Sequence, residues 1–165
     1  MNRLWAPWRV AYVTEPKKPG CVFCQTPASG DDRAGLILHR DALAYIILNR
    51  YPYNSGHLMV VPFRHVARPE LLSGDEARAM MELTGLAIRV LDRAMSPEGF
   101  NVGMNLGRTA GAGIDDHLHM HIVPRWVGDT NYMPVLADTK VLPQHLEETY
   151  ERMGEALSAL LAPRR

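Results

Sequence analysis

The sequence predicts an α+β fold in which a mainly antiparallel sheet carries one central helix, with a second helix near the C-terminus. Three observations predict it. Short apolar segments of strand composition come in runs and do not alternate strictly with helices. One long segment begins with a helix-capping pattern and repeats its apolar side chains at helical spacing. A second apolar stripe of that spacing lies near the C-terminus.

The first half of the chain contains three candidate strands, at residues 36–39, 42–48 and 58–63. They are short and rich in Ile, Val, Leu and Tyr, and turn residues such as Asn54 and Gly56 separate them. Because short turns join antiparallel neighbours, we expect a meander.

The central helix begins at a recognisable cap. Ser73 and Glu76 form a capping box, and apolar residues then recur at helical spacing to about Met95. Two further short apolar segments, at residues 100–106 and 118–123, are predicted to add strands to the same sheet.

The two ends of the chain differ in composition. An apolar stripe predicts a C-terminal helix over residues 143–162, entered at Pro143 because proline fits the first turn of a helix. Residues 1–20 form an arm rich in Trp and Pro, whose prolines remove backbone donors and exclude a regular helix. We expect this arm to wrap a surface.

Length and composition predict one globular domain over residues 1–165, because an average domain has ~150 residues. Hydrophobic residues make up 47% and charged residues 22%, which excludes a disordered chain and a coiled coil. Lys and Arg number 18, as do Asp and Glu, so no global basic field favours nucleic acid as a partner.

Several features favour the cytoplasm. No apolar run approaches the ~20 residues that cross a bilayer, so we expect no membrane partner. Arg3, Pro7 and Arg9 interrupt any signal-peptide core, and two cysteines are too few for a disulfide framework.

Three histidines, His117, His119 and His121, alternate with apolar residues along the last predicted strand. Because strand side chains alternate between faces, we expect one face of imidazoles toward solvent and one apolar face in the core. With 7 His in 165 residues, this spacing arises by chance about 0.01 times. Three solvated histidines without a chemical role are the structural alternative.

One metal ion cannot bind all three imidazoles, because the Cα atoms of His117 and His121 would lie ~13 Å apart at ~3.3 Å per residue. A single imidazole is better suited to act as a nucleophile or as an acid–base group, since its ordinary pKa of about 6.5 leaves a neutral nitrogen at pH 7.

A glycine-rich connection runs into the histidine segment. Backbone N–H groups of Gly111, Ala112, Gly113 and Ile114 are predicted to hold an anion, because glycine lets the backbone approach it closely. The alternative is a simple turn between strands.

These features together resemble the histidine-triad (HIT) family of nucleotide hydrolases and transferases. The likeness spans most of the chain and includes the glycine loop, the histidine segment 117–121, and the segments 48–49, 55–62 and 123–126. Residues 4–9 and 128–135 look more specifically like bacterial members described as diadenosine tetraphosphate phosphorylases. The resemblance implies a HIT-like fold.

The resemblance also implies roles for single residues. His119 would be the nucleophile that attacks the α-phosphorus, and the main-chain carbonyl of His117 would orient its ring. Asn49 and Asn105 are equally good turn residues at strand ends. The other implied contacts are His121 and Asn105 to phosphate oxygens, His57 beside the phosphate chain, and Asn49 facing the ribose hydroxyls.

The chain departs from the family pattern in two ways. Many members place Gln-Ser/Thr-Val before the triad, whereas residues 112–114 here leave only backbone donors. Asp115 and Asp116 also bring negative charge beside an anion site, which is unfavourable unless both carboxylates point away.

Cys21 and Cys24 form a C-x₂-C pair, which suits half a zinc site, a redox pair or two buried thiols. A redox pair normally opens a helix within a βαβ unit, and the sequence around Cys21 does not indicate that arrangement. HIT relatives with this pair, like the galactose-1-phosphate uridylyltransferase that they resemble, complete a zinc site with two histidines. The matching positions are His65 and His117.

The resemblance therefore implies an enzyme that cleaves dinucleoside polyphosphates through a nucleotidyl-His119 intermediate. The likeness of residues 128–135 favours inorganic phosphate as the acceptor, so that diadenosine tetraphosphate yields ATP and ADP. The alternatives are a nucleoside phosphoramidate or dinucleoside polyphosphate hydrolase, and a non-catalytic nucleotide- or zinc-binding module. By resemblance the protein is expected to be a homodimer.

Overall fold

The computed structural model describes residues 20–129 and 145–163. The predicted arm, apart from Gly20, lies outside the described residues, as do residues 4–9 and 130–135 of the segments that resemble the phosphorylases. The single domain over residues 1–165 remains a prediction.

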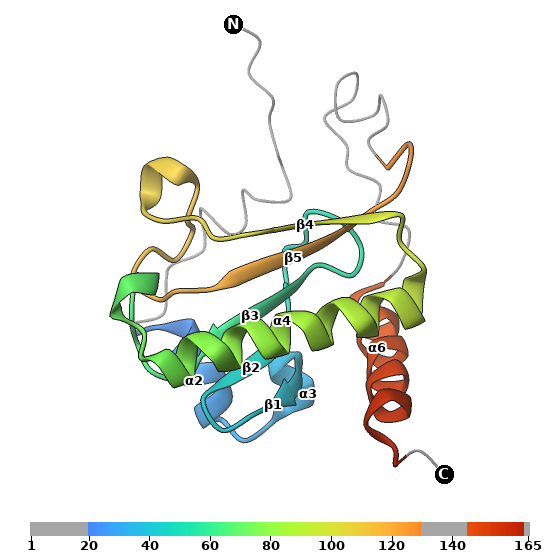
Figure 1. Cartoon of the computed structure of the whole chain (residues 1–165), viewed down its shortest axis with the longest axis horizontal. Helices are drawn as coiled ribbons and strands as arrows, with labels where there is room; N and C mark the ends of the chain where they lie inside the picture. Colours follow the sequence, from blue (N-terminus) through green and yellow to red (C-terminus); the bar gives the residue numbers. More distant parts are fainter. Residues whose placement is uncertain (1–19, 130–144, 164–165) are drawn as a thin grey trace, which may run out of the picture.

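The sheet has five strands, all antiparallel, in the order β1-β2-β3-β5-β4. The predicted α+β class is confirmed, and β1 to β3 form the expected meander (Figure 1). The strands are β1 (Ile37–Arg40), β2 (Ala44–Leu48), β3 (Leu58–Pro62), β4 (Gly99–Gly103) and β5 (Met120–Arg125).

Two strands, β2 and β5, begin two residues later than predicted, each for a local reason. The Asp41 N–H donates to the Ala44 carbonyl over 2.9 Å, and this tight turn delays β2 to Ala44. The Leu118 N–H donates to the Val66 carbonyl over 2.6 Å, so β5 joins the sheet only at Met120. His117 and His119 therefore lie just before the strand.

The central helix α4 (Gly74–Met95) is confirmed together with its capping box. Ser73 Oγ accepts from the Glu76 N–H at 3.2 Å, and the Ser73 N–H donates to Glu76 Oε2 at 2.7 Å. The helix lies across one face of the sheet, where its buried side contacts β2, β3 and β5 (Figure 1).

The C-terminal helix α6 (Leu146–Leu161) is also confirmed, with bounds inside the predicted 143–162. It packs against α4 and β1, and the Tyr150 hydroxyl donates to the Ile37 carbonyl over 2.9 Å. No helix of the described residues has the length and apolar character needed to cross a membrane.

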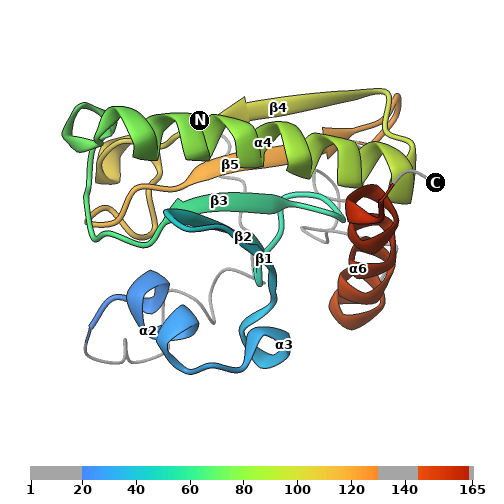
Figure 2. The same ribbon diagram turned by 60° about the horizontal axis from the view of Figure 1, so that its bottom comes forward.

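Two helices that were not predicted, α2 (Val22–Ala28) and α3 (Asp32–Gly35), lie on the side of the sheet opposite α4 (Figure 2). Cys21 is the N-cap of α2, so the cysteine pair does lie at the start of a helix, but among the described residues all strand pairs are antiparallel and no βαβ unit surrounds it. This helix is short and contains Pro27, so its stability comes from tertiary contacts. Its sequence therefore shows no periodic apolar pattern from which the helix could be predicted. One such tertiary contact is the Tyr45 hydroxyl, which donates to the Phe23 carbonyl over 2.7 Å.

Candidate active site

The predicted solvent-facing position was wrong for His117 and His119, which are 1% and 6% exposed, whereas His121 is half-buried. Helix α2 covers this side of the sheet. The ring of Phe23 lies 5.6 Å from that of His117 and 5.0 Å from that of His119, between centroids. The imidazoles are thus part of a packed layer.

His119 has a defined tautomer. Its Nδ1 lies 2.8 Å from the main-chain carbonyl oxygen of His117. A carbonyl only accepts, so Nδ1 carries the proton and Nε2 keeps its lone pair. Burial lowers the pKa of His119, and the hydrogen bond to the carbonyl offsets this only in part. The side chain is therefore neutral at pH 7, as a nucleophile requires.

His121 is held by His57, which is fully buried. The Tyr53 N–H donates to His57 Nδ1 over 3.1 Å, so the proton of a neutral His57 sits on Nε2. That Nε2 lies 2.9 Å from His121 Nδ1 and donates to it. A neutral His121 then carries its own proton on Nε2 and is a hydrogen-bond donor there.

Asn49 lies beside this histidine pair. Its Oδ1 accepts from the Tyr51 N–H over 2.9 Å, and its Nδ2 is 3.3 Å from His57 Nδ1. The structure thus brings Asn49 to His57, and its contact with ribose stays a prediction. Asn105 is half-buried and follows Gly103, the register partner of His121, by two residues.

The glycine-rich loop offers fewer free donors than predicted. The Gly111 N–H donates to the Arg108 carbonyl at 3.0 Å, and the Ala112 N–H to the Gly107 carbonyl at 3.3 Å. These bonds close the short helix η2 (Arg108–Ala110). Among the described residues, the N–H groups of 113–114 make no hydrogen bond with the protein, so they are the available pair.

The two carboxylates before the triad lie beside Arg108 and His65. Asp115 Oδ2 is 2.8 Å from Arg108 Nε, and Asp116 Oδ2 is 3.9 Å from His65 Nε2. Ion pairing with Arg108 reduces the repulsion that Asp115 would exert on a bound phosphate.

Cys21, Cys24, His65 and His117 come together, as the family resemblance implied. One ligand atom from each lies within 4.8 Å of all the others. Cys21 Sγ is 3.2 Å from His117 Nδ1, and Cys24 Sγ is 3.4 Å from His65 Nδ1. Tetrahedral zinc separates sulfur and nitrogen ligands by about 3.6 Å, from Zn–S ~2.3 Å and Zn–N ~2.1 Å, so the four residues fit this metal.

His117 belongs to both clusters. Its Nε2 donates to the Pro62 carbonyl over 2.9 Å, which leaves the Nδ1 lone pair facing the two thiols. Burial lowers the pKa of His117, and this keeps the ring neutral, the form that binds a metal. Its main-chain carbonyl meanwhile accepts from His119.

Tyr53 is a residue of the site that the sequence did not identify. Its ring stacks on His57 with centroids 4.8 Å apart, and its N–H fixes the His57 tautomer. An aromatic residue inside the turn between two strands was the available signal.

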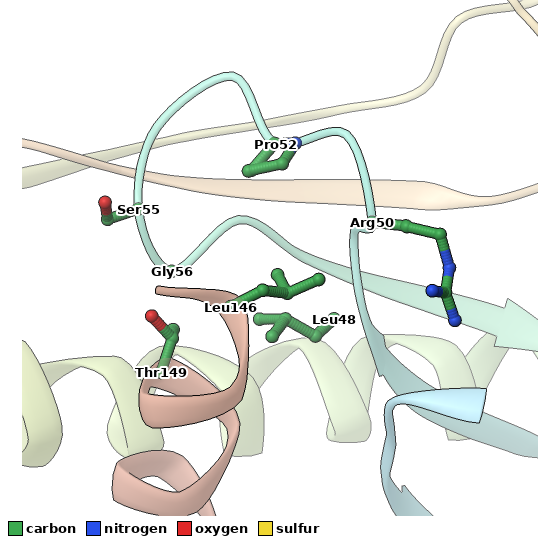
Figure 3. Close-up of a pocket in the computed structure, with 7 residues that line it drawn as sticks. All are labelled: Leu48, Arg50, Pro52, Ser55, Gly56, Leu146 and Thr149. Atoms are coloured by element: carbon green, nitrogen blue, oxygen red, sulfur yellow. The ribbon is translucent and has the colours of Figure 1, made fainter. Parts of the chain in front are cut away.

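A small cavity lies behind the connection between β2 and β3, and its lining contains none of the predicted site residues. Leu48 and Leu146 lie side by side in it (Figure 3). The lining residues, from β2, that connection and α6, are Leu48, Arg50, Pro52, Ser55, Gly56, Leu146 and Thr149.

An antiparallel sheet with alternating histidines at the start of one strand and a glycine loop before them defines the histidine-triad class. The family model described as the HIT domain matches residues 33–127, and the chain belongs to this family. It is 44% identical over 158 residues to the AP-4-A phosphorylase of Mycobacterium tuberculosis, covering 90% of this chain and 80% of that protein.

Other relatives are more distant. The adenosine 5'-monophosphoramidase hnt1 of Schizosaccharomyces pombe is 32% identical over 105 residues, which cover 64% of this chain and 74% of that protein. A hypothetical histidine triad nucleotide-binding protein from Sulfolobus tokodaii superposes with a TM-score of 0.68 at 26% identity, covering 85% of this chain and 93% of that one. A Zn-bound histidine triad family protein from Mycobacterium smegmatis shares the fold, with a TM-score of 0.67 at 22% identity over 86% of this chain and 95% of that one.

Proposed function

We propose that the protein transfers a nucleotidyl group from dinucleoside polyphosphates to inorganic phosphate, so that diadenosine tetraphosphate yields ATP and ADP. The observation that carries the proposal is the tautomer of His119, whose Nε2 lone pair is left available by the bond from Nδ1 to the His117 carbonyl. The 44% identity to an AP-4-A phosphorylase supports this substrate.

The reaction has two displacements. His119 Nε2 attacks the α-phosphorus, the bond to the bridging oxygen breaks, and its electron pair leaves with ATP. A phosphate oxygen then attacks the adenylyl phosphorus, and the electron pair of the breaking N–P bond returns to Nε2 as ADP forms. The His117 carbonyl stabilises the imidazolium that exists between these steps.

Other groups stabilise negative charge and position the nucleotide. His121 donates from Nε2 to a phosphate oxygen, as its hydrogen bond from His57 favours. The N–H groups of 113–114 and the amide of Asn105 provide further donors, and Asn49 faces the ribose. Such positioning accounts for most of the catalysis in phosphoryl transfer.

We also propose that Cys21, Cys24, His65 and His117 hold one zinc ion. When bound, the metal supplies a structural link between α2, the end of β3 and the start of β5. The four residues fit it by their spacing and by the Pro62 carbonyl that orients His117. Thiol ligands favour a reducing compartment, which supports the predicted cytoplasmic location.

The homodimer is part of the same proposal. Strand β4 is an outer strand of the sheet, and its Val102 side chain is exposed. Met81 on α4 is also exposed. A second copy of the chain would cover both the edge strand and the helix.

Turnover of diadenosine tetraphosphate with and without phosphate tests the function. We expect equal amounts of ATP and ADP, and a rate that rises with added phosphate. If phosphate leaves the rate unchanged and the products are AMP with ATP, or ADP alone, the phosphorylase assignment is wrong. Trapping radiolabelled AMP on the wild-type protein, and its absence from His119→Ala, tests the covalent intermediate separately.

A nucleoside phosphoramidate hydrolase is the second candidate, supported by the 32% identity to a monophosphoramidase. It uses the same intermediate with water as acceptor. A higher kcat/KM for adenosine phosphoramidate than for diadenosine tetraphosphate would favour it. If neither substrate transfers a labelled nucleotide to His119, the result would instead favour a non-catalytic binding module.

A further inference from the structure

Asp129, in the turn after β5, accepts hydrogen bonds from three partners. Arg125 donates to it from Nε and, over 2.8 Å, from Nη2, and Asn54 donates from Nδ2 over 2.9 Å. The Trp126 N–H lies 3.3 Å from the same carboxylate. The side chain of Asp129 is 10% exposed, so these bonds are largely shielded from water.

Asn54 carries this contact into the connection between β2 and β3, which we call the 49–57 loop. Its Nδ2 also lies 3.3 Å from the Pro124 carbonyl, and its own carbonyl accepts from the His57 N–H over 3.1 Å. Asp129 and β5 thus hold the loop at the residue next to Tyr53.

The loop in turn sets the histidine pair. The Tyr53 N–H donates to His57 Nδ1, and the His57 Nε2 donates to His121 Nδ1. The Tyr53 ring covers both imidazoles, with centroids 4.8 Å from that of His57 and 5.8 Å from that of His121. A displaced loop would remove the Tyr53 donor and leave His57 Nδ1 with only the longer, 3.3 Å approach of Asn49 Nδ2, so both tautomers would be less firmly fixed.

We propose that Asp129 is a positioning residue that holds the 49–57 loop against β5 and thereby keeps His57 and His121 as Nε2–H tautomers. Gly128 and Asp129 begin the segment 128–135, which the sequence singled out by its resemblance to the phosphorylases. Asp129 acts through Asn54 and Tyr53 and does not touch the phosphates. The expected effect of Asp129 on kcat rests on the proposed function, whereas its effect on the two histidine tautomers does not depend on that function.

The chemistry of the carboxylate explains why an amide cannot replace it. Both oxygens of Asp129 accept, and every described partner is a donor. In Asp129→Asn one oxygen becomes an NH₂ group, which faces the guanidinium of Arg125 or the amide of Asn54. At least one of these donors then lacks its acceptor, and the loop loses its anchor.

Nitrogen-15 NMR of the histidine rings in the full chain tests the tautomers directly. In the wild type we expect one set of signals each for His57 and His121, with the proton on Nε2. In Asp129→Asn we expect both rings to show averaged or doubled signals. Asn54→Asp, which places a negative charge against Asp129 and leaves Arg125 untouched, should show the same change if Asp129→Asn folds poorly.

A matched control is available at the other side of the fold. Asp32 accepts from the same two guanidinium nitrogens, Nε and Nη2, of Arg40. Asp32→Asn removes an equivalent pair and should leave the spectra of His57 and His121 unchanged. Wild-type histidine signals in both Asp129→Asn and Asn54→Asp would overturn the proposal.

Kinetics give the functional readout. We expect kcat for diadenosine tetraphosphate to fall about tenfold in Asp129→Asn with little change in KM, because a misplaced donor weakens the transition state more than binding. An unchanged kcat would contradict the positioning role. If the wild type itself shows no turnover, the proposed function fails while the NMR result still decides the role of Asp129.

Discussion

The ring of His119 donates from Nδ1 to the main-chain carbonyl of His117, and the His117 ring lies 3.2 Å from the thiol of Cys21. One residue therefore joins the candidate nucleophile to the candidate metal cluster. Any change that moves His117 must also move the acceptor that orients His119. Metal content, stability and catalysis are expected to be coupled in this protein.

Removal of the metal is the first test of this coupling. We expect about one zinc per chain by elemental analysis, and a fall in both melting temperature and turnover after chelation, because a ligand of the native state stabilises it by mass action. Cys24→Ser should reproduce both losses, whereas Ser29→Ala, at the C-cap of α2, should retain the metal. Far less than one zinc per chain, with no uptake on reconstitution, would rule the site out.

His119→Ala should abolish turnover, because it removes the nucleophile of the first displacement, without which no adenylyl intermediate forms. It should also lower the free energy of unfolding by roughly 1–3 kcal/mol, since the buried ring packs against Phe23 and leaves a cavity. Circular dichroism at the assay temperature checks that the variant is folded. His39→Ala, a half-buried histidine on β1, is the control and should keep full activity. If His119→Ala turns over any of the tested nucleotide substrates at a near-normal rate, the assignment of His119 as the nucleophile is wrong.

The sequence was sufficient for the elements whose signals are local. The capping box at Ser73 and the apolar stripe of α6 were correct, because caps and periodicity are properties of neighbouring residues. The meander followed from short strands joined by turns. The relation of His119 to the His117 carbonyl was also foreseen, through the likeness to a family.

What escaped prediction depends on contacts between distant residues. Helix α2 has no periodic pattern and is held by contacts of Tyr45 and the cysteines with distant parts of the chain. The sequence therefore did not show that this helix covers the triad, and the histidines were expected in solvent. Tyr53 acts through its main-chain N–H, which no residue type encodes. The engaged N–H groups of 111–112 likewise depend on how the loop closes.

Tyr45→Phe tests how α2 is attached to the sheet. The change removes one buried hydroxyl and leaves the Phe23 carbonyl without its donor. We expect the free energy of unfolding to fall by about 1 kcal/mol, measured by urea denaturation. Because α2 carries Cys21 and Cys24, zinc affinity should fall too. Tyr51→Phe, outside this contact, is the control, and equal zinc affinity in the Tyr45 variant and the wild type would show that α2 is held by other contacts.

Val102→Lys tests the homodimer. A charge on the outer strand β4 should prevent edge-to-edge pairing between copies, so light scattering at micromolar concentration should change from twice the 18.5 kDa chain mass to a single chain. Leu43→Lys, an equally large change at an exposed position in the turn before β2, should remain dimeric. A wild-type protein that is monomeric would contradict the prediction outright.

The lowered pKa of Glu76 determines how the free energy of unfolding should depend on pH. Arg64 and the Ser73 N–H hold its pKa at about 2, below the ordinary 4.5. Between these two values the unfolded chain binds a proton that the native carboxylate does not, so the free energy of unfolding falls as pH falls through this window. The contribution is complete above pH 4.5 and lost near pH 2.

Glu76→Gln isolates the charge from the cap, because glutamine also completes a capping box. We expect the variant to be less stable than the wild type at pH 7 and the difference to shrink as pH approaches 2, measured by urea denaturation at a series of pH values. Glu82→Gln, an exposed position on the same helix, is the control and should track the wild type throughout. A constant difference between Glu76→Gln and the wild type from pH 7 to pH 2 would mean that the loss comes from packing and that the ion pair with Arg64 contributes nothing to the pH dependence.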